Sequence, residues 1–205
     1  MLKLYGFAVS NYFNMVKIAL IEKGVEFEIV ETTPSQESDY LGKSPMGKVP
    51  CLETPEGFLS ETSVILEYIE DSQAGPSFYP ADPFEKAKVR ELMKELEIYI
   101  ELPARTCFAE AFFGGSVTDE VKAKAKADLA KGVACLKRNG KFSPFVAGET
   151  LTYADFMFMY SLNLAGAAAK RVLDTNLLED FPEARELMAT LNARDSAKQV
   201  AADQG

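Results

Sequence analysis

The opening of the chain constrains the fold most strongly, because residues 1–24 have the pattern of a strand, a short loop and a helix in direct succession. Segment 2–5 is an apolar strand, Ser10 has the side chain of a helix N-cap, and Gly24 stands where a left-handed residue ends a helix. The apolar residues between them recur at the spacing of one helical face. A helix that begins at Ser10 presents unpaired N–H groups there, which favour an anion beside the hydroxyl. The simpler alternative is that Ser10 only caps the helix.

The next 50 residues continue the pattern with two hairpin strands and a helix. Segment 25–30 alternates apolar and acidic residues, which predicts a half-buried strand parallel to the first. Segment 31–43 is polar and can hold a short irregular helix. The turn at 55–57 separates two short apolar runs and predicts a hairpin, and segment 60–63 begins another helix whose Ile65, Tyr68 and Ile69 face inward. The predicted order is therefore βαβ followed by ββα.

The second half of the chain has the periodicity of helices. Segment 76–84 is rich in turn residues and is the predicted linker. A helix over 84–111 should be kinked by Pro103, which lacks a backbone donor. Thr152 and Asp155 form a predicted capping box, and the apolar helix after them should lie at the centre of a second, all-helical domain.

Composition excludes several classes of function. The net charge is −9 with no long basic run, which argues against binding to nucleic acid or to anionic membranes. We expect a cytoplasmic protein, because the chain shows neither a leader pattern nor an uninterrupted apolar span. The absence of histidine excludes a Ser-His-Asp triad and the usual zinc sites, and the three cysteines are widely separated, so no metal is expected.

The order and spacing of four features resemble the cytosolic glutathione S-transferase family over nearly the whole chain. The features are the strand, loop and helix at Ser10, the Lys48-Val49-Pro50 turn, the Glu61-Thr62 pair, and the Thr152-x-x-Asp155 box. Within this family the chain resembles a bacterial member with a serine-type active site, similar to the tau, zeta and beta-like classes. The resemblance implies an α/β thioredoxin-like domain at 1–75, a linker at 76–84 and an all-α helical bundle at 85–205.

The resemblance also implies an activity and a set of site residues. The protein would activate the thiol of glutathione, its co-substrate, as a thiolate that attacks an electrophilic apolar co-substrate, and it would act in detoxification as a homodimer. Ser10 is the expected catalytic residue, and Tyr5, at the end of the first strand, is the alternative thiolate donor. The residues expected to bind glutathione are Lys43, Lys48, Val49, Pro50, Glu61 and Thr62. Those expected to line the co-substrate pocket are Phe13, Phe108 and Phe112.

Other functions fit the same pattern. A glutathione site can support isomerisation, peroxide reduction or dehalogenation, and the same fold also serves as a non-catalytic interaction module. Lys43 and Lys48 could be solvated surface residues, and Phe108, Phe112 and Phe113 could be core residues. The sequence does not specify the electrophile.

Overall fold

The computed structural model describes residues 1–204, which form two compact units. Unit 1 contains Met1–Phe78 together with the segment that starts at Ala193, and unit 2 is Tyr79–Asn192. The sequence predicts that residues 85–205 all belong to the helical bundle. The structure instead groups the last residues of the chain with the N-terminal unit.

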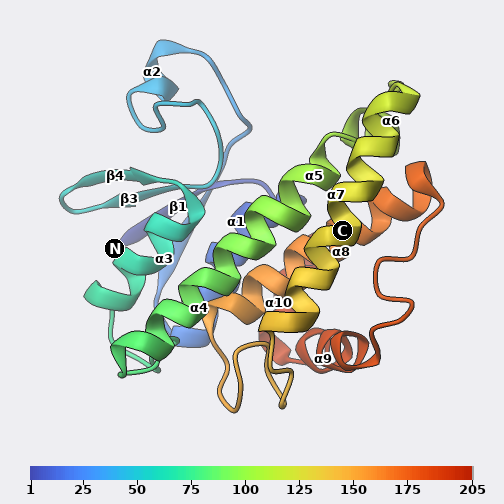
Figure 1. Ribbon diagram of the computed structural model, residues 1–205. Helices are drawn as coiled ribbons and strands as arrows, with labels where there is room; N and C mark the ends of the chain where they lie inside the picture. The colour runs from blue at the N-terminus through green and yellow to red at the C-terminus, as the bar shows by residue number, and fades with distance from the viewer. Residues whose placement is uncertain (205) are drawn as a thin grey trace. The chain divides into compact units, whose positions relative to one another are not determined.

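Unit 1 is built on a four-stranded mixed sheet, as the sequence predicts (Figure 1). Its strands are β1 (Leu2–Gly6), β2 (Phe27–Glu31), β3 (Cys51–Thr54) and β4 (Gly57–Ser60), in the order β2-β1-β3-β4. β1 and β2 are parallel, and the other two pairs are antiparallel. The predicted thioredoxin-like arrangement is therefore confirmed.

Helices cover both faces of this sheet. α1 (Asn11–Lys23) and α3 (Thr62–Ser72) contact each other and the sheet, and fully buried Leu4, Leu52 and Ile65 belong to this layer. The short α2 (Ser38–Leu41) lies on the other side of the sheet from α3 (Figure 1). There its Tyr40 packs with Tyr5 and Cys51. Successive residues of a strand point to opposite faces, so Leu4 and Tyr5 are buried in different layers.

Two features of unit 1 differ from expectation. β2 is an edge strand, and Ile29 is 45% exposed, so the apolar face of β2 is less buried than the alternating pattern suggests. The final helix α10 (Asp195–Ala202) packs against α1. The guanidinium of Arg194 binds the Glu22 carboxylate through two nitrogens at 2.7 Å each, and Ser196 also donates to Glu22. These charged contacts explain why the end of the chain belongs to unit 1.

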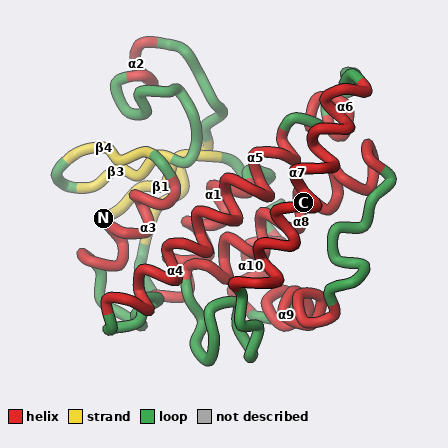
Figure 2. Tube along the Cα trace, viewed as in Figure 1, coloured by secondary structure: helices red, strands yellow, loops and turns green. Residues whose placement is uncertain are grey.

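Unit 2 consists of helices and loops (Figure 2). Its elements are α4 (Pro83–Leu96), the π-helix η1 (Glu97–Glu101), α5 (Leu102–Arg105), α6 (Phe108–Phe112), α7 (Asp119–Asn139), α8 (Tyr153–Leu173) and α9 (Pro182–Asn192). Among the helices of residues 1–204, none combines the length and the hydrophobicity that a membrane span requires.

The helix predicted over 84–111 is interrupted rather than simply kinked. Pro103 has no N–H to bond the carbonyl of Tyr99, and its ring crowds the preceding turn. The wider turn of η1 absorbs this mismatch immediately before the proline. The carbonyl of Tyr99 faces α7 at Gly132, where a Cβ atom would lie only 2.1 Å from that oxygen. Only glycine fits at this crossing.

The capping box at the start of α8 is confirmed. Asp155 is fully buried, and its carboxylate accepts from the backbone N–H groups of Val146 and Thr152, both at 2.8 Å, and from the Thr152 hydroxyl at 2.9 Å. Most of the residues in the first half of α8 are buried, which agrees with its predicted central place in the helical unit.

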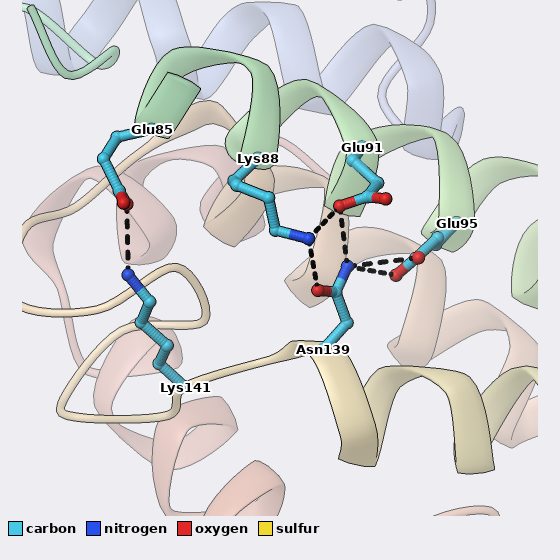
Figure 3. Close-up of polar contacts among 6 residues, drawn as sticks. All are labelled: Glu85, Lys88, Glu91, Glu95, Asn139 and Lys141. Carbon is cyan, nitrogen blue, oxygen red and sulfur yellow. Dashed lines mark hydrogen bonds and ion pairs between the residues drawn. The ribbon is translucent and has the colours of Figure 1, made fainter. Parts of the chain in front are cut away.

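A polar network joins α4 to the end of α7 (Figure 3). The amide nitrogen of Asn139 donates to both oxygens of Glu95, at 3.1 and 3.0 Å, and its amide oxygen accepts from Lys88 at 2.7 Å. Lys141, just beyond α7, pairs with Glu85 at 3.1 Å. Asn139, the last residue of α7, therefore bonds polar groups over about two turns of α4.

Candidate active site

Three segments that the sequence singled out meet at one end of the sheet of unit 1. Tyr5 pairs with Cys51, and Cys51 pairs with Ser60, so these three positions lie in one row across β1, β3 and β4. The loop to Ser10 leaves β1 at this end, Val49 and Pro50 enter β3 there, and Glu61 and Thr62 follow β4 there. The register alone brings together segments that are more than 50 residues apart in the sequence.

Ser10 caps α1 as predicted, and its hydroxyl hydrogen remains available. Its Oγ atom accepts from the N–H of Phe13 at 3.4 Å, and the backbone of Ser10 is extended before the helix begins. Within residues 1–204, the hydroxyl donates to no other group. An acceptor placed before the helix would therefore meet the Ser10 O–H and the positive end of the helix dipole together.

The turn before β3 presents its backbone to the same end of the sheet. The peptide bond between Val49 and Pro50 is cis. Neither the N–H nor the C=O of Val49 makes a turn or loop hydrogen bond with the described part of the chain. The preceding residue is held in place, because the carbonyl of Lys48 accepts from Tyr40 at 3.0 Å and from Ser44 at 2.8 Å. Lys48 itself is exposed, and its ammonium has no partner in the residues described.

Glu61 is the N-cap residue of α3 and has an unusual backbone conformation. Its φ angle is +69°, a region that residues with a side chain rarely adopt. The side chain is exposed and makes no cap hydrogen bond to its own helix. Strain of this kind persists where the surroundings enforce it and often marks a binding site. Thr62, the first residue of α3, is buried.

Tyr5 is engaged with a partner that sequence reasoning did not identify. Its hydroxyl donates to the Glu53 carboxylate at 2.5 Å, and Glu53 also pairs with Lys3 at 3.3 Å. The hydrogen bond to Glu53, together with burial, raises the pKa of Tyr5 to about 12. A phenol that is already donating and is this weakly acidic is a poor donor to a thiolate. The alternation of β1 and β3 could have indicated the pair, since Lys3 and Glu53 are register partners and Tyr5 shares their face.

Lys43 lies over the same face of the sheet. Its ammonium is 5.2 Å from the centre of the Tyr5 ring and 5.8 Å from that of Phe58, both within the range of cation–π attraction. Lys43 and Lys48 are therefore not equivalent: one cation is engaged by aromatic rings, and the other is unpaired within residues 1–204.

The structure corrects one of the expected pocket residues. Phe13 is only 1% exposed, and its ring packs so closely on Gly6 that a Cβ atom there would lie 2.2 Å from it. Phe13 is therefore a core residue of unit 1. Phe108 and Phe112 are half-buried on α6, with ring centres 5.1 Å apart, and the Arg171 guanidinium lies 5.0 Å from Phe112. These two rings form an aromatic cluster within unit 2.

The cysteines and acidic residues do not provide a second kind of site. Cys51 is fully buried, and burial raises the pKa of its thiol to about 11, so it is a core residue. Within residues 1–204, no three histidine, cysteine or carboxylate side chains are grouped as metal ligands would be.

Comparison with known proteins identifies the family. Residues 4–77 match the N-terminal domain of glutathione S-transferases, and residues 106–202 match their C-terminal domain. A glutathione S-transferase of Pseudomonas putida is 59% identical over 203 residues, which is 99% of this chain and 92% of that protein.

Solved structures of the family have the same fold. A glutathione transferase from Populus trichocarpa aligns over 100% of both chains with a TM-score of 0.82 and 20% identity. A glutathione S-transferase from Methylobacterium radiotolerans, solved in complex with glutathione sulfonate, aligns over 97% of this chain and 93% of its own with a TM-score of 0.79 and 23% identity. The chain therefore belongs to the glutathione S-transferase family.

Proposed function

We propose that Ser10 activates the glutathione thiol by donating its hydroxyl hydrogen to the thiolate at the start of α1. One observation supports this choice of donor. The Ser10 hydroxyl accepts a hydrogen bond from its own helix and donates none within residues 1–204, whereas the hydroxyl of the alternative donor, Tyr5, already donates to Glu53. Ser10 keeps its own proton in this mechanism, so no histidine base is needed.

The energy required is within reach of this arrangement. A free thiol with a pKa of about 8.5 is only a few per cent thiolate at neutral pH, and the thiolate is the nucleophile. Lowering that pKa by ~2 units takes about 2.7 kcal/mol of preferential stabilisation. One hydrogen bond to a charged group contributes about 1.5–3 kcal/mol, and the helix N-terminus contributes about 0.3–1 kcal/mol more.

The rest of the tripeptide is held, in this proposal, by the other two segments at the same end of the sheet. Val49 pairs its free backbone groups with the peptide of glutathione beside Pro50. The carboxylate of Glu61 faces the α-ammonium group, and Thr62 provides a hydroxyl and a helix start for the α-carboxylate. Lys48 binds the glycyl carboxylate, and Lys43 contributes a second positive charge to the binding of glutathione. The unpaired charges of Lys48 and Glu61 support this assignment.

We also propose a class of co-substrate, a location, a role and an oligomeric state. The co-substrate is an apolar electrophile, for which Phe108 and Phe112 provide an aromatic surface. The protein acts in the cytoplasm, in detoxification, as a homodimer. The dimer is supported by a run of half-exposed apolar residues on unit 2, namely Ile98, Tyr99 and Leu102. Light scattering after size-exclusion chromatography measures the oligomeric state directly.

Steady-state kinetics of two variants test the proposed donor. Ser10→Ala should lower the turnover number about tenfold to a hundredfold, because a charge-assisted hydrogen bond made to the thiolate is lost, while calorimetric affinity for glutathione changes little. Tyr5→Phe should keep turnover within about twofold of wild type. Loss of turnover in Tyr5→Phe, with wild-type turnover in Ser10→Ala, would assign the activation to Tyr5 and leave Ser10 as a cap.

A further inference from the structure

Two side chains donate to a single carbonyl group in the loop before Ser10. The side-chain amide of Asn14 donates to the carbonyl oxygen of Ala8 at 2.7 Å. The side-chain amide of Gln204, at the end of the chain, donates to the same oxygen at 3.2 Å. One donor comes from the first turns of α1, and the other comes from a segment 196 residues away in sequence.

Asn14 is placed for this one bond. Its side chain is 1% exposed, in the interior of unit 1. Its other amide atom, Oδ1, is buried without a hydrogen-bond partner in residues 1–204. A buried acceptor without a partner is unfavourable, so packing alone would favour an apolar residue here. The bond to Ala8 is the polar contact that explains an asparagine at this position.

The end of the chain is anchored so that Gln204 reaches the loop. Arg194 is bonded to Glu22 near the end of α1, and Lys17, buried in the middle of α1, is paired with Asp203. Asp203 directly precedes Gln204. The tail therefore follows α1 from its last turn back toward its first turn, where Gln204 contacts the Ala8 carbonyl.

The loop has few other constraints. Val9, between Ala8 and Ser10, is 68% exposed, so side-chain packing does not hold it. The N–H of Ser10 donates to the carbonyl of Phe7 at 3.0 Å, and the carbonyl and Oγ atoms of Ser10 accept from backbone N–H groups of α1 at 2.9 and 3.4 Å. These bonds hold Ser10 itself, but they do not hold the peptide between Ala8 and Val9. The Ala8 carbonyl belongs to the peptide that leads into Val9, so holding it fixes the direction from which Ser10 enters the helix.

We propose that Asn14 and Gln204 are positioning residues that clamp the Ala8 carbonyl and thereby hold the Ser10 hydroxyl in line with the glutathione thiolate. The inference rests on the proposed role of Ser10 and extends it to the C-terminal tail. Small displacements of a catalytic group lower the rate far more than they lower binding. The clamp therefore affects turnover and thiolate stabilisation, and it leaves glutathione affinity largely unchanged.

Three variants of the full chain test the clamp. Asn14→Leu keeps the size of the side chain and removes the donor, Gln204→Ala removes the second donor at an exposed position that cannot unfold the core, and the double variant removes both. Thr54→Val is the matched control, because Thr54 is a buried polar residue of unit 1 whose hydrogen bonds stay within its own hairpin. Each variant is assayed for turnover, for the Michaelis constant of glutathione, and for the thiolate pKa of bound glutathione.

We expect Asn14→Leu to lower turnover about tenfold and to raise the thiolate pKa by ~0.5–1 unit, with the Michaelis constant within about twofold of wild type. Gln204→Ala should have a smaller effect of the same kind. The double variant should lose more than the product of the single losses, because the two donors hold one atom. Thr54→Val should keep wild-type turnover and thiolate pKa.

Two outcomes would overturn the clamp. One is a fall in turnover that is fully explained by a smaller fraction of folded protein, while the thiolate pKa of bound glutathione is unchanged. The other is wild-type behaviour of both single variants and of the double variant. Ser10→Ala, measured in parallel, distinguishes failure of the clamp from failure of the proposed role of Ser10. If it raises the thiolate pKa while the clamp variants do not, the clamp is wrong and the role of Ser10 stands. If Ser10→Ala itself leaves that pKa unchanged, the proposed function fails first.

Discussion

Replacing Asp155 with alanine should destabilise the protein far more than removal of an ordinary helix cap. The substitution leaves the N–H groups of Val146 and Thr152 without their acceptor, and these residues are 0% and 2% exposed. The hydroxyl of Thr152 also loses its acceptor. A buried donor left without a partner costs about 1–3 kcal/mol, so the two backbone N–H groups together cost about 2–6 kcal/mol.

Scanning calorimetry measures the effect. For a chain of this length each kcal/mol lowers the midpoint by roughly 2–4 °C, so Asp155→Ala should lower it by about 4–24 °C. Thr118→Ala is the matched control. Thr118 caps α7 by accepting from the N–H of Val121 at 3.4 Å in an exposed position, so its loss should cost only about 1 kcal/mol. Equal shifts for the two variants would refute the argument from burial.

The cost of Asp155→Ala should also depend on pH. Burial raises the pKa of Asp155 to about 6, whereas an aspartate in an unfolded chain has a pKa of about 3.9. The folded protein binds this proton more tightly than the unfolded chain, so the wild type gains stability as the pH falls from about 6 toward 4. The variant lacks that gain. The difference in midpoint between the two proteins should therefore be larger at pH 5 than at pH 8, and a difference that shrinks on acidification would contradict the assignment.

Three further predictions concern polar contacts. An alkaline titration followed by tyrosinate absorbance measures the pKa of Tyr5 as the difference between the curves of wild type and Tyr5→Phe. That pKa should lie near 12, and Glu53→Gln should lower it. A wild-type value near 10 would mean that the bond to Glu53 is absent. Glu61→Gln should weaken glutathione binding by roughly tenfold to a hundredfold in calorimetry with the fold intact, and equal affinities would remove Glu61 from the site. Asn139→Leu breaks the bonds to α4 in Figure 3 and should lower the free energy of unfolding by ~1–2 kcal/mol in urea, and an unchanged midpoint would show that the network is not stabilising.

Features that depend on a few neighbouring residues could be predicted from the sequence. The cap at Ser10, the left-handed Gly24 and the box at Thr152 and Asp155 each involve groups that lie within four residues of one another, so their chemistry is visible in a short window. Tertiary packing did not oppose these local preferences, and the predicted elements therefore formed where expected.

Features that depend on distant residues could not be predicted in the same way. The Tyr5–Glu53 bond joins residues 48 positions apart, and the contact of Gln204 with Ala8 joins the two ends of the chain. The π-helix before Pro103 replaces an expected kink, because the proline specifies a lost hydrogen bond but not how the preceding turn adjusts. The positive φ of Glu61 also had no local signal, since glutamate does not favour that conformation.

The thiolate pKa of glutathione bound to the wild type, to Ser10→Ala and to Tyr5→Phe tests the central claim most directly. It is read from the ultraviolet absorbance of the thiolate as a function of pH, with glutathione at saturation. Loss of a hydrogen bond of about 1.5–3 kcal/mol should raise that pKa by roughly one to two units in Ser10→Ala and leave it unchanged in Tyr5→Phe. An unchanged pKa in Ser10→Ala, with a raised pKa in Tyr5→Phe, would contradict the account.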